Sequence, residues 1–192
     1  LEQFAVTHGL KIGTIADLIH YRTQTEATVE RFSECSLPTP QGEFRLYGYQ
    51  EVYSQEVHLA LVHGQLNPEQ PALVRVHMLN PLCDMFGARR SGCGGWPLTD
   101  VMARVQQETA GVIVVLRTWD NPRALANRLE QFQHQDRGLT QAREDSFDLR
   151  TYGVGAQILR DLGVRKMRLL AAPMKIHGLS GFDLEIVEYV TA

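Results

Sequence analysis

The chain has 192 residues, of which 44% are hydrophobic and 21% are charged, and its formal net charge is −3. This length and composition are typical of one globular domain with an appendage, or of two small domains. The small negative charge argues against a nucleic-acid or anionic-membrane ligand, and no apolar run approaches the roughly 20 residues of a membrane helix. Three cysteines without framework spacing favour a reducing compartment over a disulfide scaffold, so we expect a cytoplasmic protein.

The first segment, residues 4–31, has the pattern of the end of a domain. Residues 14–17 have capping-box spacing, and one apolar stripe follows at Ile15, Leu18 and Ile19. A helix this short cannot bury its stripe alone, so we expect it to pack on another domain. Prolines and a glycine in residues 36–42 predict a connection, which places a domain boundary between residues 35 and 36.

Beyond that boundary, alternating or continuous apolar runs predict strands, and apolar residues at helical spacing predict helices. The predicted strands are 44–49, 57–63, 73–77, 112–116, 167–171 and 184–190, and the predicted helices are 98–105, 124–135 and 154–162. The charged, unperiodic residues 137–146 predict a loop. Because strands alternate with helices after residue 97 and the first half resembles hairpins, we expect an α/β fold, a layered α/β/α domain with a mixed sheet.

The run 75–95 combines a strand end, two cysteines and a glycine cluster, as metal-binding loops do. A zinc site built from His77, Cys83 and Cys93 is one interpretation, although the spacing fits no standard motif. Buried, unpaired cysteines are the alternative. The arginine pair at 89–90 either grips a phosphate or is solvated.

Residues 8–22 resemble the closing segment of 3,4-dihydroxy-2-butanone-4-phosphate synthase, an enzyme of riboflavin biosynthesis. The resemblance implies that residues 1–35 are the C-terminal remnant or linker of such a synthase domain. The acidic metal site and catalytic carboxylates of that enzyme would lie upstream.

Residues 37–49, 152–164 and 178–188 are similar to the framework of GTP cyclohydrolase II. The resemblance implies that residues 36–192 form a GTP cyclohydrolase II-like domain, fused behind the synthase and assembled as a homodimer. That family opens the imidazole ring of GTP with a zinc-activated water and releases formate and pyrophosphate.

The resemblance also locates the zinc ligands of the family, which are three cysteines. Their positions fall on Asn80, Ser91 and Cys93, so only one thiol remains. Bound zinc lowers the pKa of water from about 15.7 to about 7, and without it hydroxide is scarce at neutral pH. We therefore expect no zinc and no other cofactor.

Other positions of the family's site also differ. Trp119 stands in place of a glutamate and Asn121 in place of an arginine, both of which contact the substrate in the family. Trp96 replaces a glutamine, Phe132 replaces a tyrosine whose hydroxyl polarises the substrate, and the phosphate-binding turn is shortened to residues 171–173. The two tryptophans are either core residues or plugs of the old pocket.

Some site residues match the family. Asp148 and Arg150 match its general base and its nucleophilic arginine, whereas spacing alone favours a surface ion pair worth about 0–1 kcal/mol. Arg75, His77 and Lys175 match residues that meet the triphosphate.

Three functions remain open. The first is a module without ring-opening activity that stabilises, dimerises or regulates the attached synthase and binds nucleotide weakly. The second is an active GTP cyclohydrolase II with an altered metal site, and the third is an enzyme for another nucleotide that works without zinc. The joint loss of metal ligands, guanine contacts and phosphate turn favours the first.

Overall fold

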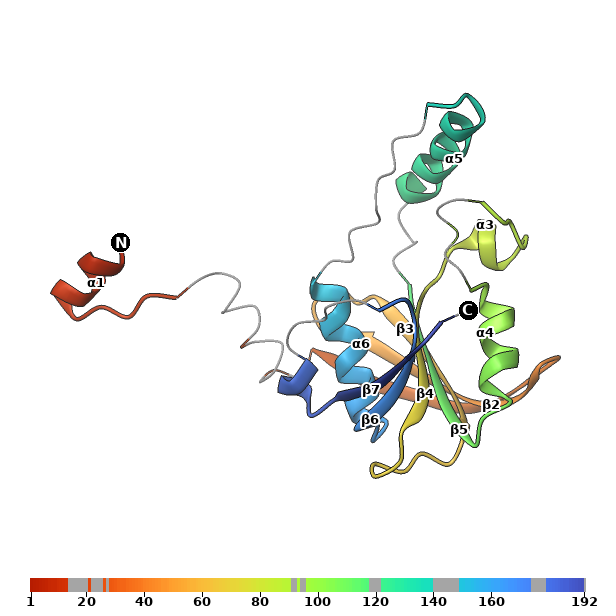
Figure 1. Ribbon diagram of the computed structural model, residues 1–192, viewed down its shortest axis with the longest axis horizontal. Coiled ribbons are helices and arrows are strands. Elements are labelled where there is room, and N and C mark those ends of the chain that lie inside the picture. The colour runs from red at the N-terminus through yellow and green to blue at the C-terminus, as the bar shows by residue number, and fades with distance from the viewer. Residues whose placement is uncertain are drawn as a thin grey trace.

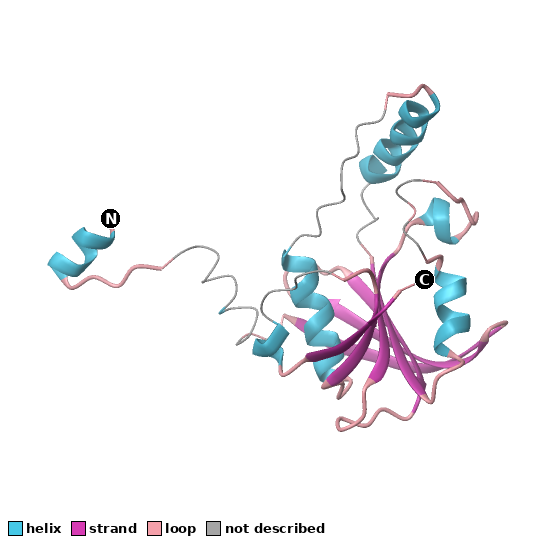
Figure 2. Ribbon diagram, viewed as in Figure 1, coloured by secondary structure: helices cyan, strands magenta, loops and turns pink. Residues whose placement is uncertain are grey.

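The computed structural model describes residues 1–13, 21, 26, 28–90, 93, 96–117, 122–139, 149–173 and 179–191. A seven-stranded sheet forms the centre of the molecule, and helices cover both of its faces (Figures 1 and 2). The expected α/β/α layering is confirmed. In the described residues, no helix is long and apolar enough to span a membrane.

The sheet is mixed, as the sequence predicts. Its order is β1-β2-β3-β5-β4-β6-β7, with antiparallel pairing from β1 to β5 and parallel pairing from β5 to β7. The strands are β1 (Val29–Thr39), β2 (Gly42–Glu51), β3 (Val57–Gly64), β4 (Ala72–Met78), β5 (Ala110–Leu116), β6 (Lys166–Leu170) and β7 (Glu185–Val190). All six predicted strands are present.

Two helices supply the outer layers, one on each face. The helical elements are α1 (Glu2–His8), α3 (Pro81–Asp84), α4 (Leu98–Val105), α5 (Pro122–Asp136), α6 (Leu149–Asp161) and the short 3-10 helix η1 (Leu179–Phe182). Helix α4 packs on one face and α6 on the other, while α5 projects from the body (Figure 1). The three predicted helices correspond to α4, α5 and α6.

The central strand β5 explains why the sequence has a continuous apolar run at this point. Val112 and Val114 pack into the core beneath α6, whereas Ile113 and Val115 pack into the core beneath α4. All four side chains are almost completely buried. A strand covered on both faces cannot alternate between apolar and polar residues.

Strand β1 corrects the predicted connection at 36–42. These residues form the end of β1 and its turn into β2, so the boundary placed between residues 35 and 36 falls inside a strand. Charged residues and Pro38 hide the strand in the sequence, and an edge position tolerates both. A register shift between Arg31 and Ser33 interrupts the pairing with β2.

Polar contacts fix β1 against α6. The Arg31 guanidinium donates to Asp161 Oδ2 from both Nε, at 2.9 Å, and Nη2, at 2.5 Å. The Tyr49 hydroxyl donates to the same oxygen at 2.6 Å. Burial and the Asp161 carboxylate raise the pKa of Tyr49, so the phenol stays protonated.

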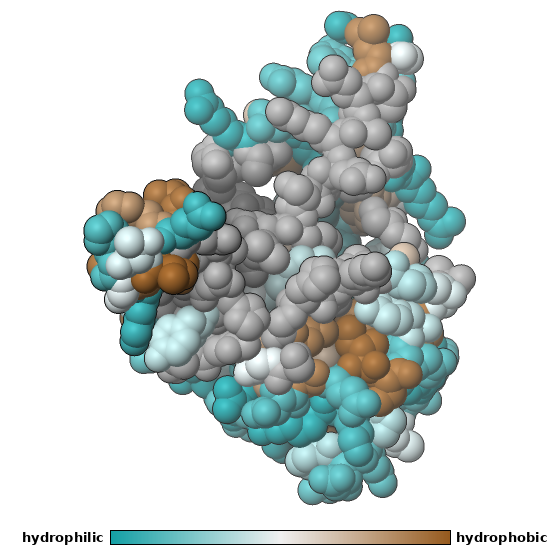
Figure 3. Space-filling view, turned by 60° about the vertical axis from the view of Figure 1, so that its left-hand side comes forward, coloured by the Kyte–Doolittle hydropathy of each residue, from teal (hydrophilic) through white to brown (hydrophobic). Residues whose placement is uncertain are grey.

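The N-terminal segment lies apart from this body. Helix α1 ends at His8, and Gly9 in the left-handed conformation is its C-cap. Phe4 and Val6 are exposed, and Figure 3 shows apolar surface on this segment. The predicted helix at 14–22 lies almost entirely outside the described residues, as does most of the predicted loop at 137–146.

Candidate functional site

The end of β4 holds two of the residues that the sequence assigns to a site. Arg75 and His77 are two positions apart and lie on the same face of the strand. Arg75 Nη1 donates to the Leu170 carbonyl at 2.7 Å, but its buried Nε has no partner among the described residues. Burial lowers the pKa of Arg75, and the negative charge of Asp84 offsets this only in part.

His77 is held by a carboxylate that the sequence analysis missed. Its Nε2 lies 3.1 and 3.0 Å from the two carboxylate oxygens of Asp84, and both side chains are almost fully buried. Because the ionised carboxylate can only accept, Nε2 carries the proton. His77 Nδ1 is buried without a partner among the described residues.

Asp84 also organises the surrounding backbone. Its Oδ2 accepts from the Asn80 amide at 2.8 Å, and its Oδ1 accepts from the Leu98 amide at 3.0 Å. Burial alone would raise the pKa of Asp84, but the hydrogen bonds from His77 and these two amides outweigh burial and hold that pKa below its ordinary value. Asp84 thus joins β4, α3 and the start of α4.

The positions that correspond to zinc ligands have other partners. Asn80 is the N-cap of α3, where its Oδ1 accepts from the Leu82 amide at 3.2 Å. Cys93 forms a disulfide with Cys83, and Ser91 lies outside the described residues. With its sulfur oxidised and its amide oxygen engaged, this donor set does not fit a zinc ion.

The disulfide differs from both interpretations of Cys83 and Cys93. A zinc site of His77, Cys83 and Cys93 is excluded in this arrangement, because the sulfurs bond to each other and His77 faces Asp84. The interpretation of Cys83 and Cys93 as unpaired is wrong, because they form the disulfide; the remaining cysteine, Cys35, is free and exposed. The chain begins to return towards Cys83 just after α3, where Gly87 has a φ of 64° and the Ala88 amide donates to the Leu82 carbonyl at 3.3 Å.

Several other predicted residues cannot be placed. Asp148, Lys175, Trp119 and Asn121 lie outside the described residues. Arg150 belongs to the first turn of α6, but its side chain also lies outside the described part. The pairing of Asp148 with Arg150 thus stays a prediction.

The predicted aromatic residues have structural roles. Trp96 is partly buried against the core beneath α4, as one of the two interpretations expects. Phe132 lies on α5, and the Arg90 guanidinium lies 4.7 Å from its ring centroid. Arg90 is therefore not simply solvated, while its neighbour Arg89 is exposed.

A small cavity of about 220 Å³ lies beside Arg75, between α6 and the ends of β4 and β6. Most of its lining is apolar, and Gly155 and Leu159 of α6 form one wall. This lining fits an apolar group better than a charged one.

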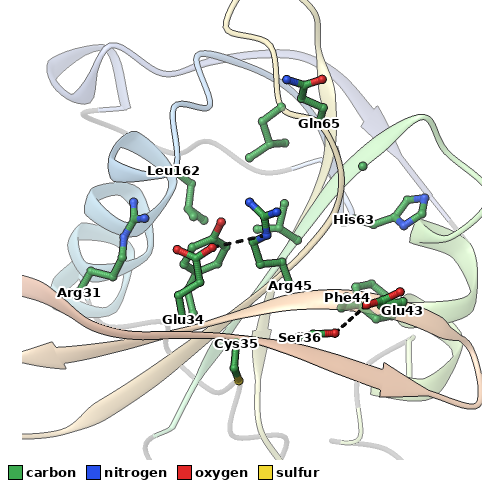
Figure 4. Close-up of a pocket in the computed structure, with 14 residues that line it drawn as sticks. Arg31, Glu34, Cys35, Ser36, Glu43, Phe44, Arg45, His63, Gln65 and Leu162 are labelled. Carbon is green, nitrogen blue, oxygen red and sulfur yellow. Dashed lines mark hydrogen bonds and ion pairs between the residues drawn. The ribbon is translucent and has the colours of Figure 1, made fainter.

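A larger, open hollow of about 1080 Å³ lies between the β1–β2 ribbon and the end of α6 (Figure 4). Its charged side chains pair within the chain: Arg45 with Glu34 at 3.5 Å, Arg31 with Asp161, and Glu43 with a serine hydroxyl. These pairs leave little charge to select an ionic ligand.

Among the described residues, one group has the composition of a metal site. The ligand atoms of Glu51, Glu56 and His58 lie within 4.8 Å of one another. However, His58 Nε2 faces Glu51 at 3.0 Å, and His58 Nδ1 accepts from the Arg117 amide at 3.2 Å. Both ring nitrogens are engaged, so the buried pair joins strands rather than binding a cation.

Comparison with known proteins supports one family. The family model for GTP cyclohydrolase II matches residues 30–191. A protein named 3,4-dihydroxy-2-butanone 4-phosphate synthase from Pseudomonas syringae pv. tomato is 45% identical over 190 residues, which are 99% of this chain and 51% of that protein. The riboflavin biosynthesis protein RibBA of Chlorobium phaeovibrioides is 42% identical over 188 residues, covering 95% of this chain and 46% of RibBA.

A solved structure agrees with these relatives. The crystal structure of RibBX, a two-domain 3,4-dihydroxy-2-butanone 4-phosphate synthase from A. baumannii, matches with a TM-score of 0.62 and 43% identity. The match covers 100% of this chain and 48% of that one. This chain thus spans about half the length of the relatives that it matches.

Proposed function

Because the chain belongs to the GTP cyclohydrolase II family, we propose that it is a non-catalytic module of a longer, cytoplasmic riboflavin-biosynthesis protein. The module keeps the cyclohydrolase fold without zinc-dependent ring opening. It stabilises, dimerises or regulates a 3,4-dihydroxy-2-butanone-4-phosphate synthase fused to it. Relatives named as that synthase, and a two-domain protein of that name, support the fusion.

The observation that carries the proposal is the state of the zinc-ligand positions. Asn80 Oδ1 caps a helix, and the Cys93 sulfur is bonded to Cys83. Even when that bond is reduced, these positions supply one thiol and an amide oxygen that caps a helix, which is fewer donors than a zinc site needs. Without zinc, water near Cys93 keeps its ordinary pKa, and the purine carbon lacks a hydroxide nucleophile.

The N-terminal segment supports the fusion on physical grounds. Helix α1 has seven residues, too few to persist alone in water. It exposes Phe4 at 58% and Val6 at 83%, together with the neighbouring Ile12 at 58%. We propose that these side chains pack on the synthase half and that α1 belongs to that half.

Metal content and formate release test the loss of ring opening. We expect the purified full-length protein to contain no stoichiometric zinc and to release no formate from GTP. The matched variant restores the ligand set by Asn80→Cys and Ser91→Cys, with Cys83→Gly to remove the competing disulfide. Zinc uptake by this variant alone would support the proposal, whereas stoichiometric zinc and GTP turnover in the parent protein would refute it.

Synthase kinetics test the regulatory part. We expect the synthase half, separated from residues 29–192, to show a lower rate, a lower melting temperature or a smaller assembly than the full-length protein. Light scattering of both forms distinguishes loss of a homodimer from loss of activity. Identical rate, stability and assembly would refute this part and leave the absence of ring opening untouched.

Weak nucleotide binding is a second candidate, favoured by the buried Nε of Arg75, for which the described residues offer no acceptor. Calorimetric titration with GTP and other nucleotides measures it. Heat that disappears in Arg75→Met would support binding at this site. Equal heat in both proteins would contradict it.

A further inference from the structure

The loop that follows β4 is closed by a covalent bond. Cys83 of α3 and Cys93 are linked, with their Cα atoms 5.5 Å apart, and Cys83 is 2% exposed. Cys93 is less buried, and its amide donates to the Arg90 carbonyl at 3.0 Å. The disulfide therefore fixes the turn that carries Arg90.

Arg90 in turn anchors helix α5. Its Nη2 donates to the Phe132 carbonyl at 3.2 Å, its guanidinium forms an ion pair with Asp136, and it also lies over the Phe132 ring. Arg128 and Gln135 of α5 also have interaction partners, but the described contacts of Arg90 join α5 to the turn that the disulfide closes. A polar helix of 15 residues is marginal in water, so each anchor counts.

We propose that the Cys83–Cys93 disulfide is a thiol-sensitive latch that holds α5 against the body through Arg90. When the bond is reduced, the turn loses its covalent constraint, Arg90 leaves its position, and α5 unfolds or swings away more often. This inference goes beyond the proposed function and does not depend on it.

The chemistry is thiol–disulfide exchange with a low-molecular-weight thiol of the glutathione class. The external thiolate attacks Cys93 Sγ, the less buried sulfur, to form a mixed disulfide, and Cys83 leaves as a thiolate that takes up a proton. A second external thiolate then attacks the external sulfur, which releases Cys93 as a thiol and yields the external disulfide. Two electrons thus reduce the protein while two external thiols are oxidised.

Hydrogen exchange measured by mass spectrometry tests the latch in the full-length protein. All samples carry Cys35→Ser, because this exposed thiol would otherwise join the exchange. In peptides from residues 122–136, we expect about tenfold faster exchange after reduction by dithiothreitol than after oxidation by oxidised glutathione. Peptides from α4 and β5 serve as internal controls and should not change.

Two variants separate the bond from the anchor. Cys93→Ser should exchange quickly at α5 even after oxidation, as the reduced parent does. Arg90→Ala should exchange quickly at α5 in both redox states, because the side chain that connects the disulfide-closed turn to α5 is then missing. Peptide mapping of the linked cysteines accompanies each sample.

Four outcomes would overturn the inference. The first is that Cys83 and Cys93 are not linked in the oxidised sample. The second is that α5 exchanges equally fast in the disulfide-linked parent and in the reduced parent, a comparison that needs no variant. The third is a redox response that persists in Arg90→Ala. Faster exchange of the whole protein on reduction would also refute it, since the effect would then be global.

Discussion

Replacement of Asp84 by asparagine should destabilise the fold strongly, although the two side chains have almost the same shape. Each carboxylate oxygen of Asp84 accepts from one backbone amide: Oδ2 from Asn80 and Oδ1 from Leu98. In Asp84→Asn, one of these oxygens becomes an NH2 group, which faces an N–H donor whichever way the amide is turned. His77 can adapt by changing its tautomer, but a backbone amide cannot.

The magnitude follows from this geometry. One buried amide left without an acceptor costs about 1–3 kcal/mol. The remaining hydrogen bonds lose their charge assistance, which adds about 1 kcal/mol. We therefore expect the free energy of unfolding to fall by about 3 kcal/mol at neutral pH, measured by urea denaturation with the disulfide intact.

Asp100→Asn is the matched control, because Asp100 is an exposed acidic residue in the first turn of α4. Its loss should cost less than about 1 kcal/mol. If Asp84→Asn costs no more than Asp100→Asn, the account of Asp84 as a double backbone acceptor is wrong.

The pH dependence gives an independent check. The pKa of Asp84 is lowered in the folded protein, so its contribution is fully present above the unfolded value of about 3.9 and is lost as the pH falls through the folded value. The stability difference between the parent and Asp84→Asn should therefore be constant near neutral pH and shrink below about pH 4. A difference that grows on acidification would contradict the sign of the shift.

Three further predictions concern single side chains. Gly64→Ala should cost about 2–3 kcal/mol in urea denaturation, because Gly64 has a φ of 69° and a Cβ would lie 2.0 Å from the Thr109 carbonyl oxygen. Gly138 has the same φ, but a Cβ there would meet no atom, so Gly138→Ala measures the backbone strain alone. Equal losses of unfolding free energy in the two variants would show that the contact with Thr109 contributes nothing. Tyr49→Phe should lower the melting temperature at a cost of about 1 kcal/mol, since the hydroxyl bond to Asp161 is lost; an unchanged melting temperature would show that this bond contributes nothing. Arg75→Met should leave the free energy of unfolding unchanged or raise it by about 1 kcal/mol, because it removes a buried and incompletely paired cation; a loss above about 2 kcal/mol would refute that reading.

The sequence predicts the layered body well because burial on two faces imposes strong patterns. The continuous apolar run at 112–116 predicts a strand buried on both faces, and the apolar residues of α4 at helical spacing predict a helix with one buried face. Strand β1 escapes prediction because an edge strand needs no apolar face, and its charges and Pro38 are the signals of a loop.

At the site, sequence reasoning locates Arg75 and His77 but misses the hydrogen-bond partners that hold these two side chains in place. Asp84 lies seven residues from His77, and the contact depends on the short helix α3, which has no periodicity to detect. The disulfide is missed because the turn that follows α3, at Gly87 and Ala88, has no pattern in the sequence that would predict it. Spacing in sequence becomes distance in space only after the local backbone is known.

The interrupted register of β1 should limit edge-to-edge pairing of this strand with other chains. An eleven-residue strand at a sheet margin is a template on which another chain can polymerise. The irregularity between Arg31 and Ser33 breaks the even row of outward amides, so an incoming strand would mispair partway along. Removing that irregularity by deleting Phe32 would straighten this edge, and we expect the protein to aggregate more readily as a result.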